Sequence, residues 1–210
     1  FSQLLEAVSA FAAAQPEPAQ VYVWLDVLTV NQHAGGEALP QAWWATAFKQ
    51  GICAIEHTCL VLAPWRTPIP MTRAWCLWEL LCTAEGGARL SVQLPPAEAA
   101  DFERALVEDF DAIARAVAAV DVRNAEAFDP NDLRMIRGAV EAGVGYGGLN
   151  ARVLEQLRVW LADAARAALA RLDAHERGTS TLLDRTAMLL QDQGRLDEAR
   201  PLCEEALAAR

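Results

Sequence analysis

Hydrophobic positions along the first 94 residues predict an alternation of helices and buried strands. Residues 4–12 carry apolar side chains at helical spacing, and Pro16 follows that segment. Residues 21–30 form a β-branched and aromatic run with almost no polar alternation, which is typical of a strand buried on both faces of a parallel sheet. Residues 58–63 repeat this character, and residues 89–94 do so more weakly. The helical pattern around Trp78 would connect these two strands, so we expect a doubly wound parallel α/β sheet.

The second half of the chain has a helical pattern. After Pro95 and Pro96, apolar residues three or four apart share one helix face. Residues 120–122 are a candidate for a short last strand. The pair Asp129-Pro130 predicts the start of a helix, with the aspartate as cap and the proline in the first turn. The glycine-rich residues 143–148 end that helix, and a long helix follows from about Asn150.

Composition and charge exclude some classes of function. Hydrophobic residues make up 53% of the 210 residues and charged residues 22%, as in a globular protein with a core. The formal net charge of -10 disfavours binding to nucleic acid. Charged residues, proline or glycine interrupt every apolar run before it is long enough to span a membrane. The five cysteines lack the short spacing of zinc sites and are expected to be free thiols in the cytoplasm.

A polar loop follows the predicted strand at residues 21–30. Asn31, Gln32 and His33 come directly after that strand, and Gly35 and Gly36 end the loop. Ligands bind at the carboxyl ends of strands in open parallel sheets, so these side chains are candidates for ligand contacts. The alternative is that Asn31 and Gln32 only cap the local backbone and that His33 is exposed.

Two further patches carry candidate chemistry. Trp75 and Glu79 share one face of the helix that Thr72 is expected to cap, and an acid beside indole rings needs a hydrogen-bond partner or a raised pKa. Arg66 follows the strand at residues 58–63, where it would hold an anionic group or, alternatively, be an exposed surface arginine.

The last segment resembles a tetratricopeptide repeat, especially the kinesin-light-chain type. Two amphipathic helices are separated by Gly194, and small residues stand where paired helices approach closely. These small positions and the flanking apolar ones are Ala187, Ala199, Ala206, Leu190 and Leu207. Cys203 occupies a position where an aromatic residue is more usual. Such repeats need neighbours, and the resemblance implies that the parent chain continues beyond residue 210 and binds protein partners.

Residues 1–125 resemble Toll/interleukin-receptor (TIR) domains and the related heterokaryon-incompatibility domains. The run Trp75-Cys-Leu-Trp-Glu79 is similar to the Trp-Cys-Leu-x-Glu helix motif of the TIR family. Trp24-Leu-Asp26, followed by Asn31 and Gln32, is similar to a motif of the heterokaryon-incompatibility domains, as is the Arg73, Trp75, Glu79 spacing. The resemblance implies a flavodoxin-like fold that self-associates in signalling. The resemblance also implies that the first, central strand of that fold is missing before residue 1.

In catalytic TIR domains the motif glutamate carries NAD⁺ cleavage, and the resemblance makes Glu79 the candidate catalytic carboxylate. No resident cofactor is implied, since NAD⁺ would be the substrate. Trp75 or Trp78 would stack on nicotinamide or adenine. Further candidates for substrate binding are Asp26, Asn31, Gln32, His33 and Arg66. In non-catalytic members the same helix is structural, and that alternative stays open for Glu79.

These observations predict three segments: a TIR-like α/β domain at residues 1–125, a helical extension at 126–177, and one tetratricopeptide hairpin at 178–210. The expected function is a cytoplasmic signalling scaffold that forms homo-oligomers through the first segment and binds proteins through the last. One alternative is an NAD⁺ nucleosidase that is active when clustered. A second alternative is a non-catalytic ciliary or transport adaptor.

Overall fold

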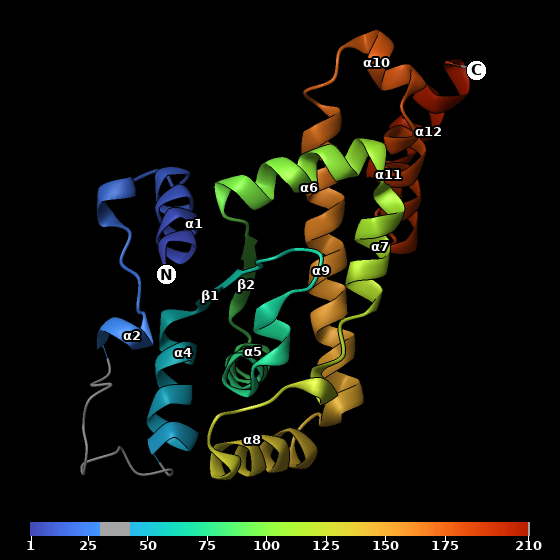
Figure 1. Cartoon of the computed structure of the whole chain (residues 1–210). Coiled ribbons are helices and arrows are strands. Elements are labelled where there is room, and N and C mark those ends of the chain that lie inside the picture. Colours follow the sequence, from blue (N-terminus) through green and yellow to red (C-terminus); the bar gives the residue numbers. More distant parts are fainter. Residues whose placement is uncertain (30–42, 210) are drawn as a thin grey trace.

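The computed structural model describes residues 1–29 and 43–209 of the chain (Figure 1). Helices predominate, and two short strands lie among them. The elements of the first half are α1 (Ser2–Ala13), η1 (Pro18–Gln20), α2 (Asp26–Thr29), η2 (Trp44–Phe48), α4 (Lys49–Ile55), β1 (His57–Val61), η3 (Ile69–Thr72), α5 (Ala74–Gly86) and β2 (Arg89–Gln93). Those of the second half are α6 (Pro96–Glu108), α7 (Phe110–Ala118), η4 (Val122–Asn124), α8 (Pro130–Ala142), α9 (Gly145–Leu169), α10 (Ala174–Thr179), α11 (Thr181–Asp192) and α12 (Leu196–Ala208).

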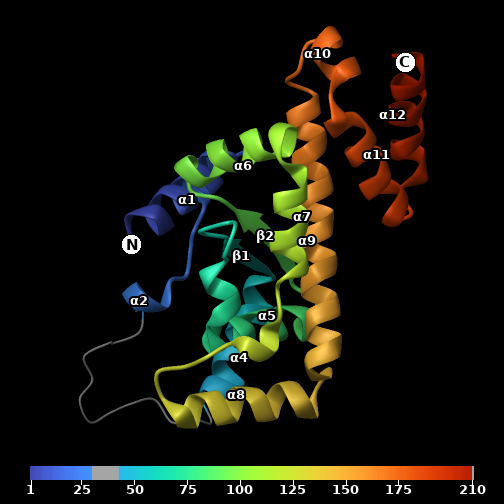
Figure 2. The ribbon, with the colours of Figure 1, turned by 45° about the vertical axis from the view of Figure 1, so that its right-hand side comes forward.

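The two strands and the helix between them form one parallel crossover unit. β1 pairs with β2 in parallel, with His57 opposite Arg89 and Val61 opposite Gln93. The chain passes through α5 between the two strands, as parallel strands require a long connection. Helices surround this pair of strands (Figures 1 and 2). The predicted α/β class is confirmed at this level, with two strands in the described part of the chain.

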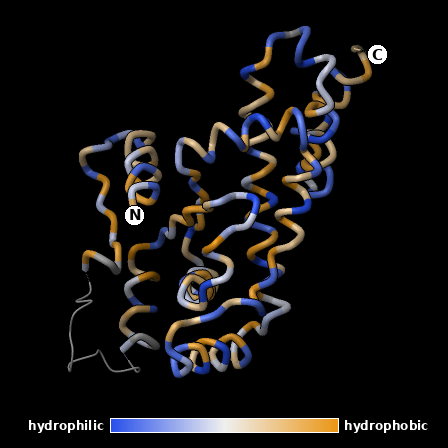
Figure 3. The backbone as a smooth tube through the Cα atoms, in the orientation of Figure 1, coloured by the Kyte–Doolittle hydropathy of each residue, from blue (hydrophilic) through white to orange (hydrophobic). Residues whose placement is uncertain are grey.

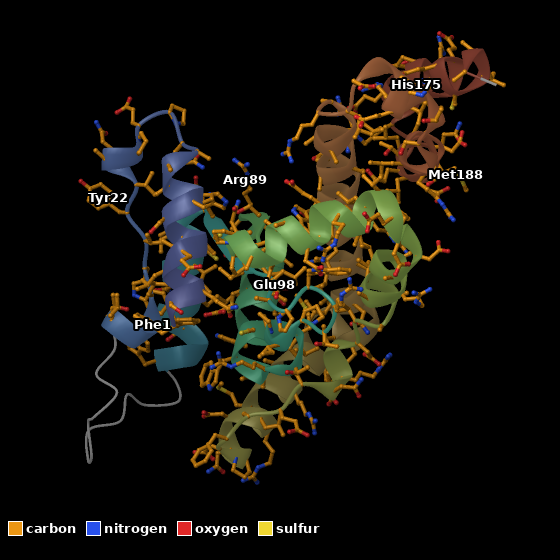
Figure 4. The ribbon with its side chains drawn as sticks, turned by 45° about the horizontal axis from the view of Figure 1, so that its top comes forward. Phe1, Tyr22, Arg89, Glu98, His175 and Met188 are labelled. Atoms are coloured by element: carbon orange, nitrogen blue, oxygen red, sulfur yellow. The ribbon has the colours of Figure 1, made fainter. Side chains whose placement is uncertain are left out.

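The prediction of a strand at residues 21–30 is wrong for the residues that the structure describes. Residues 21–25 have no regular structure, and Asp26–Thr29 form the short helix α2. Tyr22 is 90% exposed and points away from the rest of the molecule (Figure 4). A β-branched composition stabilises a strand only where neighbouring strands pair with it and bury its side chains, and here these side chains lie largely in solvent.

The short strand expected at residues 120–122 is also absent, because side chains bind the backbone there. Asp121 accepts a hydrogen bond from the backbone N–H of Arg123, and Asn150 of α9 accepts one from Val122. Residues Val122–Asn124 therefore form a 3-10 turn, η4, with Val122 buried against the core. The local hydrogen bonds replace those that a neighbouring strand would supply.

Several helix boundaries follow the predicted signals. α1 ends before Pro16, and α8 begins at Pro130 with the Asp129 carboxylate accepting a hydrogen bond from Asn131 N. The helical pattern after Pro96 divides into α6 and α7 at Asp109, whose carboxylate caps α7 by accepting from Ala112 N. Hydrophobic and hydrophilic positions alternate along the helices (Figure 3), as expected for helices that bury one side.

The core consists of two buried clusters that the long helix α9 connects. The first surrounds α5 and contains residues from Phe48 to Leu157, and the second contains residues from Trp65 to Ala206. Trp160 of α9 packs against both clusters. Neither cluster follows the division of the chain at residues 125 and 177.

Replacing Asp129 by alanine is expected to lower the free energy of unfolding by about 1 kcal/mol, the usual contribution of an N-cap side chain. The carboxylate lies 2.8 Å from Asn131 N, in the first turn of α8. Urea denaturation measures the change. Asp129→Ser retains a capping oxygen and should remain close to the wild type, whereas equal losses in both variants would contradict a capping role.

Candidate functional site

The motif helix α5 is anchored at its start by the backbone of a distant segment. Ala74 N donates a hydrogen bond to Glu126 O at 2.8 Å, and Glu126 N donates to Thr72 O. The expected capping role of Thr72 is wrong, because its hydroxyl instead donates to Ile69 O and closes the turn η3. A backbone acceptor in a neighbouring segment thus satisfies a donor that a side-chain cap would otherwise have bound.

Trp75 lies half-buried at a groove between the start of α5 and the start of α8. Its indole Nε1 donates to the Asp132 carboxylate at 3.1 Å. The groove has a volume of about 490 Å³, and its walls include Arg73, Glu126 and the fully exposed Phe128. Trp75 therefore presents part of its ring to a space that a ligand could enter, although its N–H group is already bonded.

Glu79 lies one helical turn after Trp75 and is half-buried. Its backbone carbonyl accepts a hydrogen bond from the Thr83 hydroxyl at 2.6 Å. The charge of Glu79 also acts on Cys82, although burial is the main reason that the pKa of Cys82 is raised to about 12. Cys82 is therefore a neutral thiol at physiological pH. Trp75, Glu79 and Cys82 follow one another at four- and three-residue spacing, so they share one face of α5.

Trp78 is a core residue. Its side chain is 5% exposed and belongs to the first cluster, so it offers little ring surface to a ligand. Its indole Nε1 is buried without a hydrogen-bond partner among the described residues. An unsatisfied buried donor costs stability, which makes this nitrogen an unusual feature of the core.

The candidate loop residues Asn31, Gln32 and His33 lie outside the described residues, and of Asp26 the structure describes only the backbone, at the start of α2. The residues on either side of this loop lie near the same aromatic ring. Trp24 contacts the Phe48 ring edge-on at 5.2 Å, and the Trp43 ring lies 6.4 Å from it. Phe48 is buried in the same cluster as Trp78. The predicted meeting of the loop with Glu79 stays a prediction.

Arg66 lies in a different part of the molecule from Trp75. Its guanidinium stacks on the Trp65 ring at 4.2 Å and forms an ion pair with Asp101 of α6 at 3.3 Å. The Trp65 indole N–H, then Arg104 and Arg66, hold the pKa of Asp101 below its usual value. α6 and α8 lie at opposite ends of the α5 region (Figures 1 and 2), so the structure does not bring Arg66 to the groove that Trp75 lines.

A second pocket, of about 500 Å³, lies between the end of α5, the start of β2 and α9. No sequence motif indicated it. The packing of α9 against β2 joins residues about sixty positions apart, and no local pattern carries that information. The sequence offers one weak signal for this pocket: Arg89 and Arg152 are basic residues that each stand next to an apolar position.

No protein-family profile matches the chain, and neither does any curated protein or solved structure. In the described part of the chain, no three His, Cys, Asp or Glu side chains gather where they could hold a metal ion. None of the helices described for this chain combines the length and the apolar character needed to cross a membrane.

Proposed function

We propose that this chain is a cytoplasmic scaffold that binds other proteins through its C-terminal helical pair. The observation that carries the proposal is the packing of α11 against α12. Ala187, Ala199 and Ala206 are buried in this pair, and Gly194 lies in the connection between the two helices with φ +70°. Large apolar side chains on the same two helices stay exposed, namely Met188, Leu196 and Leu207. Exposed apolar side chains on a helical pair closed by small residues are what a tetratricopeptide-like binding element presents to a partner.

The first part of the chain is proposed to be a TIR-like domain of flavodoxin-like topology that self-associates. The parallel unit β1–α5–β2 supports this proposal, because the helix with the Trp-Cys-Leu-x-Glu motif is the connection between the two strands. Within the described residues, each of the two strands pairs with the other alone, so each retains one edge that a further strand could use.

A peptide library panned against the immobilised full chain tests the binding function. Peptides that bind the wild type should lose at least about tenfold in affinity on the double variant Met188→Ser, Leu207→Ser, because two of the three exposed apolar side chains are removed. A matched double variant, Tyr22→Ser with Ile55→Ser, removes exposed apolar side chains elsewhere and should bind as the wild type does. Binding that both double variants weaken equally would contradict a site on α11 and α12.

A second candidate function is cleavage of NAD⁺ by Glu79. Glu79 is half-buried one helical turn from the partly accessible Trp75, and a carboxylate can stabilise the positive charge that develops as a glycosidic bond breaks.

Nicotinamide release from NAD⁺ by the concentrated chain tests this candidate. Release by the wild type should fall by at least about a hundredfold in Glu79→Gln, which keeps the size of the side chain and removes its charge. Glu85→Gln on the same helix breaks an ion pair with Lys49 and serves as the control. No release from the wild type, or equal release from Glu79→Gln, would remove the enzymatic candidate and leave the scaffold.

A further inference from the structure

The pocket between α5, β2 and α9 has an apolar floor. Leu80 in the middle of α5 and Leu149 and Val153 on α9 are each at most 3% exposed and line its base. Ala84 and Leu90 are half-buried and extend the apolar wall toward solvent. The volume of about 500 Å³ falls within the range of sites that hold small organic molecules.

The rim of this pocket is polar and carries more positive than negative charge. Arg89 at the start of β2 and Arg152 on α9 are exposed and line it together with Glu155 and Gln156. Neither arginine has an ion pair or a side-chain hydrogen bond within the described part of the chain. Two free guanidinium groups therefore face one carboxylate, on a chain whose formal net charge is -10.

The C-terminal end of α5 lies beside this rim and affects its charge only weakly. The last carbonyls of a helix carry partial negative charge, which disfavours a bound anion, but the N–H groups of Gly87 and Ala88 both donate to Thr83 O and satisfy that carbonyl. Guanidinium groups bind carboxylates through paired N–H donors, and the amide of Gln156 adds another donor at the rim. The pocket thus combines an apolar base with donors for a single anionic group.

We propose that this pocket binds a small amphipathic carboxylate of the medium-chain fatty acid class. The alkyl chain lies against Leu80, Leu149 and Val153, and the carboxylate lies between Arg89 and Arg152. Its lining includes neither Glu79 nor any residue of α11 and α12, so the proposed ligand does not depend on either function proposed above. Binding adds contacts only to the folded state and therefore stabilises it.

Isothermal titration calorimetry of the full chain with decanoate tests the proposal, at concentrations below those at which decanoate forms micelles. We expect one decanoate per chain and a rise in the melting temperature. Decanol, which has the same number of carbon atoms and no charge, should bind at least about tenfold more weakly because it cannot form charged pairs with the arginines. Equal binding of decanol and decanoate would overturn the assignment of the two guanidinium groups, and no binding of decanoate would overturn the proposal.

Substitutions at the rim and in the wall separate this site from non-specific binding. Arg89→Gln and Arg152→Gln should each weaken decanoate binding by about tenfold, whereas Arg158→Gln, a solvent-exposed change on α9 outside the pocket, should not. Ala151→Phe fills the pocket from an exposed position and should abolish binding without altering the circular dichroism spectrum. If a second copy of the chain covers the pocket instead, the wild type will sediment as a dimer that Ala151→Phe dissociates, and decanoate will not bind.

Discussion

Replacement of Trp65 by alanine is expected to lower the free energy of unfolding by about 3–5 kcal/mol, the range for deletion of a buried tryptophan. The side chain is 2% exposed, and its ring packs edge-on against Phe102 at 5.5 Å. Phe102 in turn lies 4.8 Å from the ring of Trp160 on α9. The substitution therefore removes the first of three rings that join the segment after β1 to α6 and α9.

Two hydrogen bonds add to the role of this residue. The Trp65 backbone N–H donates to Glu98, in the first turn of α6, at 2.9 Å, and the indole Nε1 donates to Asp101 at 3.0 Å (Figure 4 labels Glu98). Trp65→Phe keeps one ring in the cluster and loses the indole donor together with the volume of the second ring, so it should be less destabilising than Trp65→Ala. Because that donor is the largest cause of the lowered pKa of Asp101, the pKa of Asp101 should rise in Trp65→Phe.

Guanidinium chloride denaturation measures the stability change, and nuclear magnetic resonance titration measures the pKa. Tyr22→Ala is the matched control, since this aromatic side chain is 90% exposed and should change stability by no more than about 0.5 kcal/mol. A loss below about 1 kcal/mol for Trp65→Ala would show that the contact between the β1 segment and α6 is not part of the stable core.

Local signals in the sequence predicted the helices and strands that short apolar runs, caps and prolines define. The strands β1 and β2 and the helix α5 between them fall where the apolar runs placed them, and the Asp129 cap starts α8. The helices α11 and α12 also occupy the expected ranges. A cap, a proline or a helical spacing acts within a few residues, so it can be identified without knowledge of the fold.

Features that depend on distant partners could not be predicted in this way. The run at residues 21–25 has a composition suitable for a strand, but a strand also needs a neighbour, and the sequence does not specify one. Val122 has its backbone N–H bound by Asn150, 28 residues away along the chain. In both places a tertiary contact, or the lack of a pairing strand, overrides the local preference.

The sequence predicted which residues belong to the candidate site, but it did not predict how their side chains are arranged. Trp75 lies on the expected helix, but its indole N–H donates to Asp132, 57 residues further along the chain, which no motif indicated. Arg66 follows a strand end as expected, and its charge is taken by Asp101 on α6. Motifs therefore predicted which side chains belong to α5, whereas no motif indicated the contacts with other helices that fix their orientation.

Replacement of Leu190 by alanine is expected to lower the free energy of unfolding by about 2–5 kcal/mol. Leu190 on α11 has no exposed surface and belongs to the same buried cluster as Trp65, Phe102 and Leu161. Truncation leaves a cavity where α11 packs against α12 and α9. Met188→Ala on the same helix is the matched control, because Met188 is 56% exposed and its loss should cost no more than about 0.5 kcal/mol.

This substitution also tests whether the C-terminal pair unfolds with the rest of the chain. All seven tryptophans lie at or before Trp160, so tryptophan fluorescence reports on the part of the molecule outside α11 and α12. Because one cluster spans Trp65 to Ala206, the fluorescence midpoint in denaturant should shift in Leu190→Ala together with the circular dichroism midpoint. If only the circular dichroism signal changes, α11 and α12 unfold by themselves, and the shared cluster contributes little coupling between them and α9.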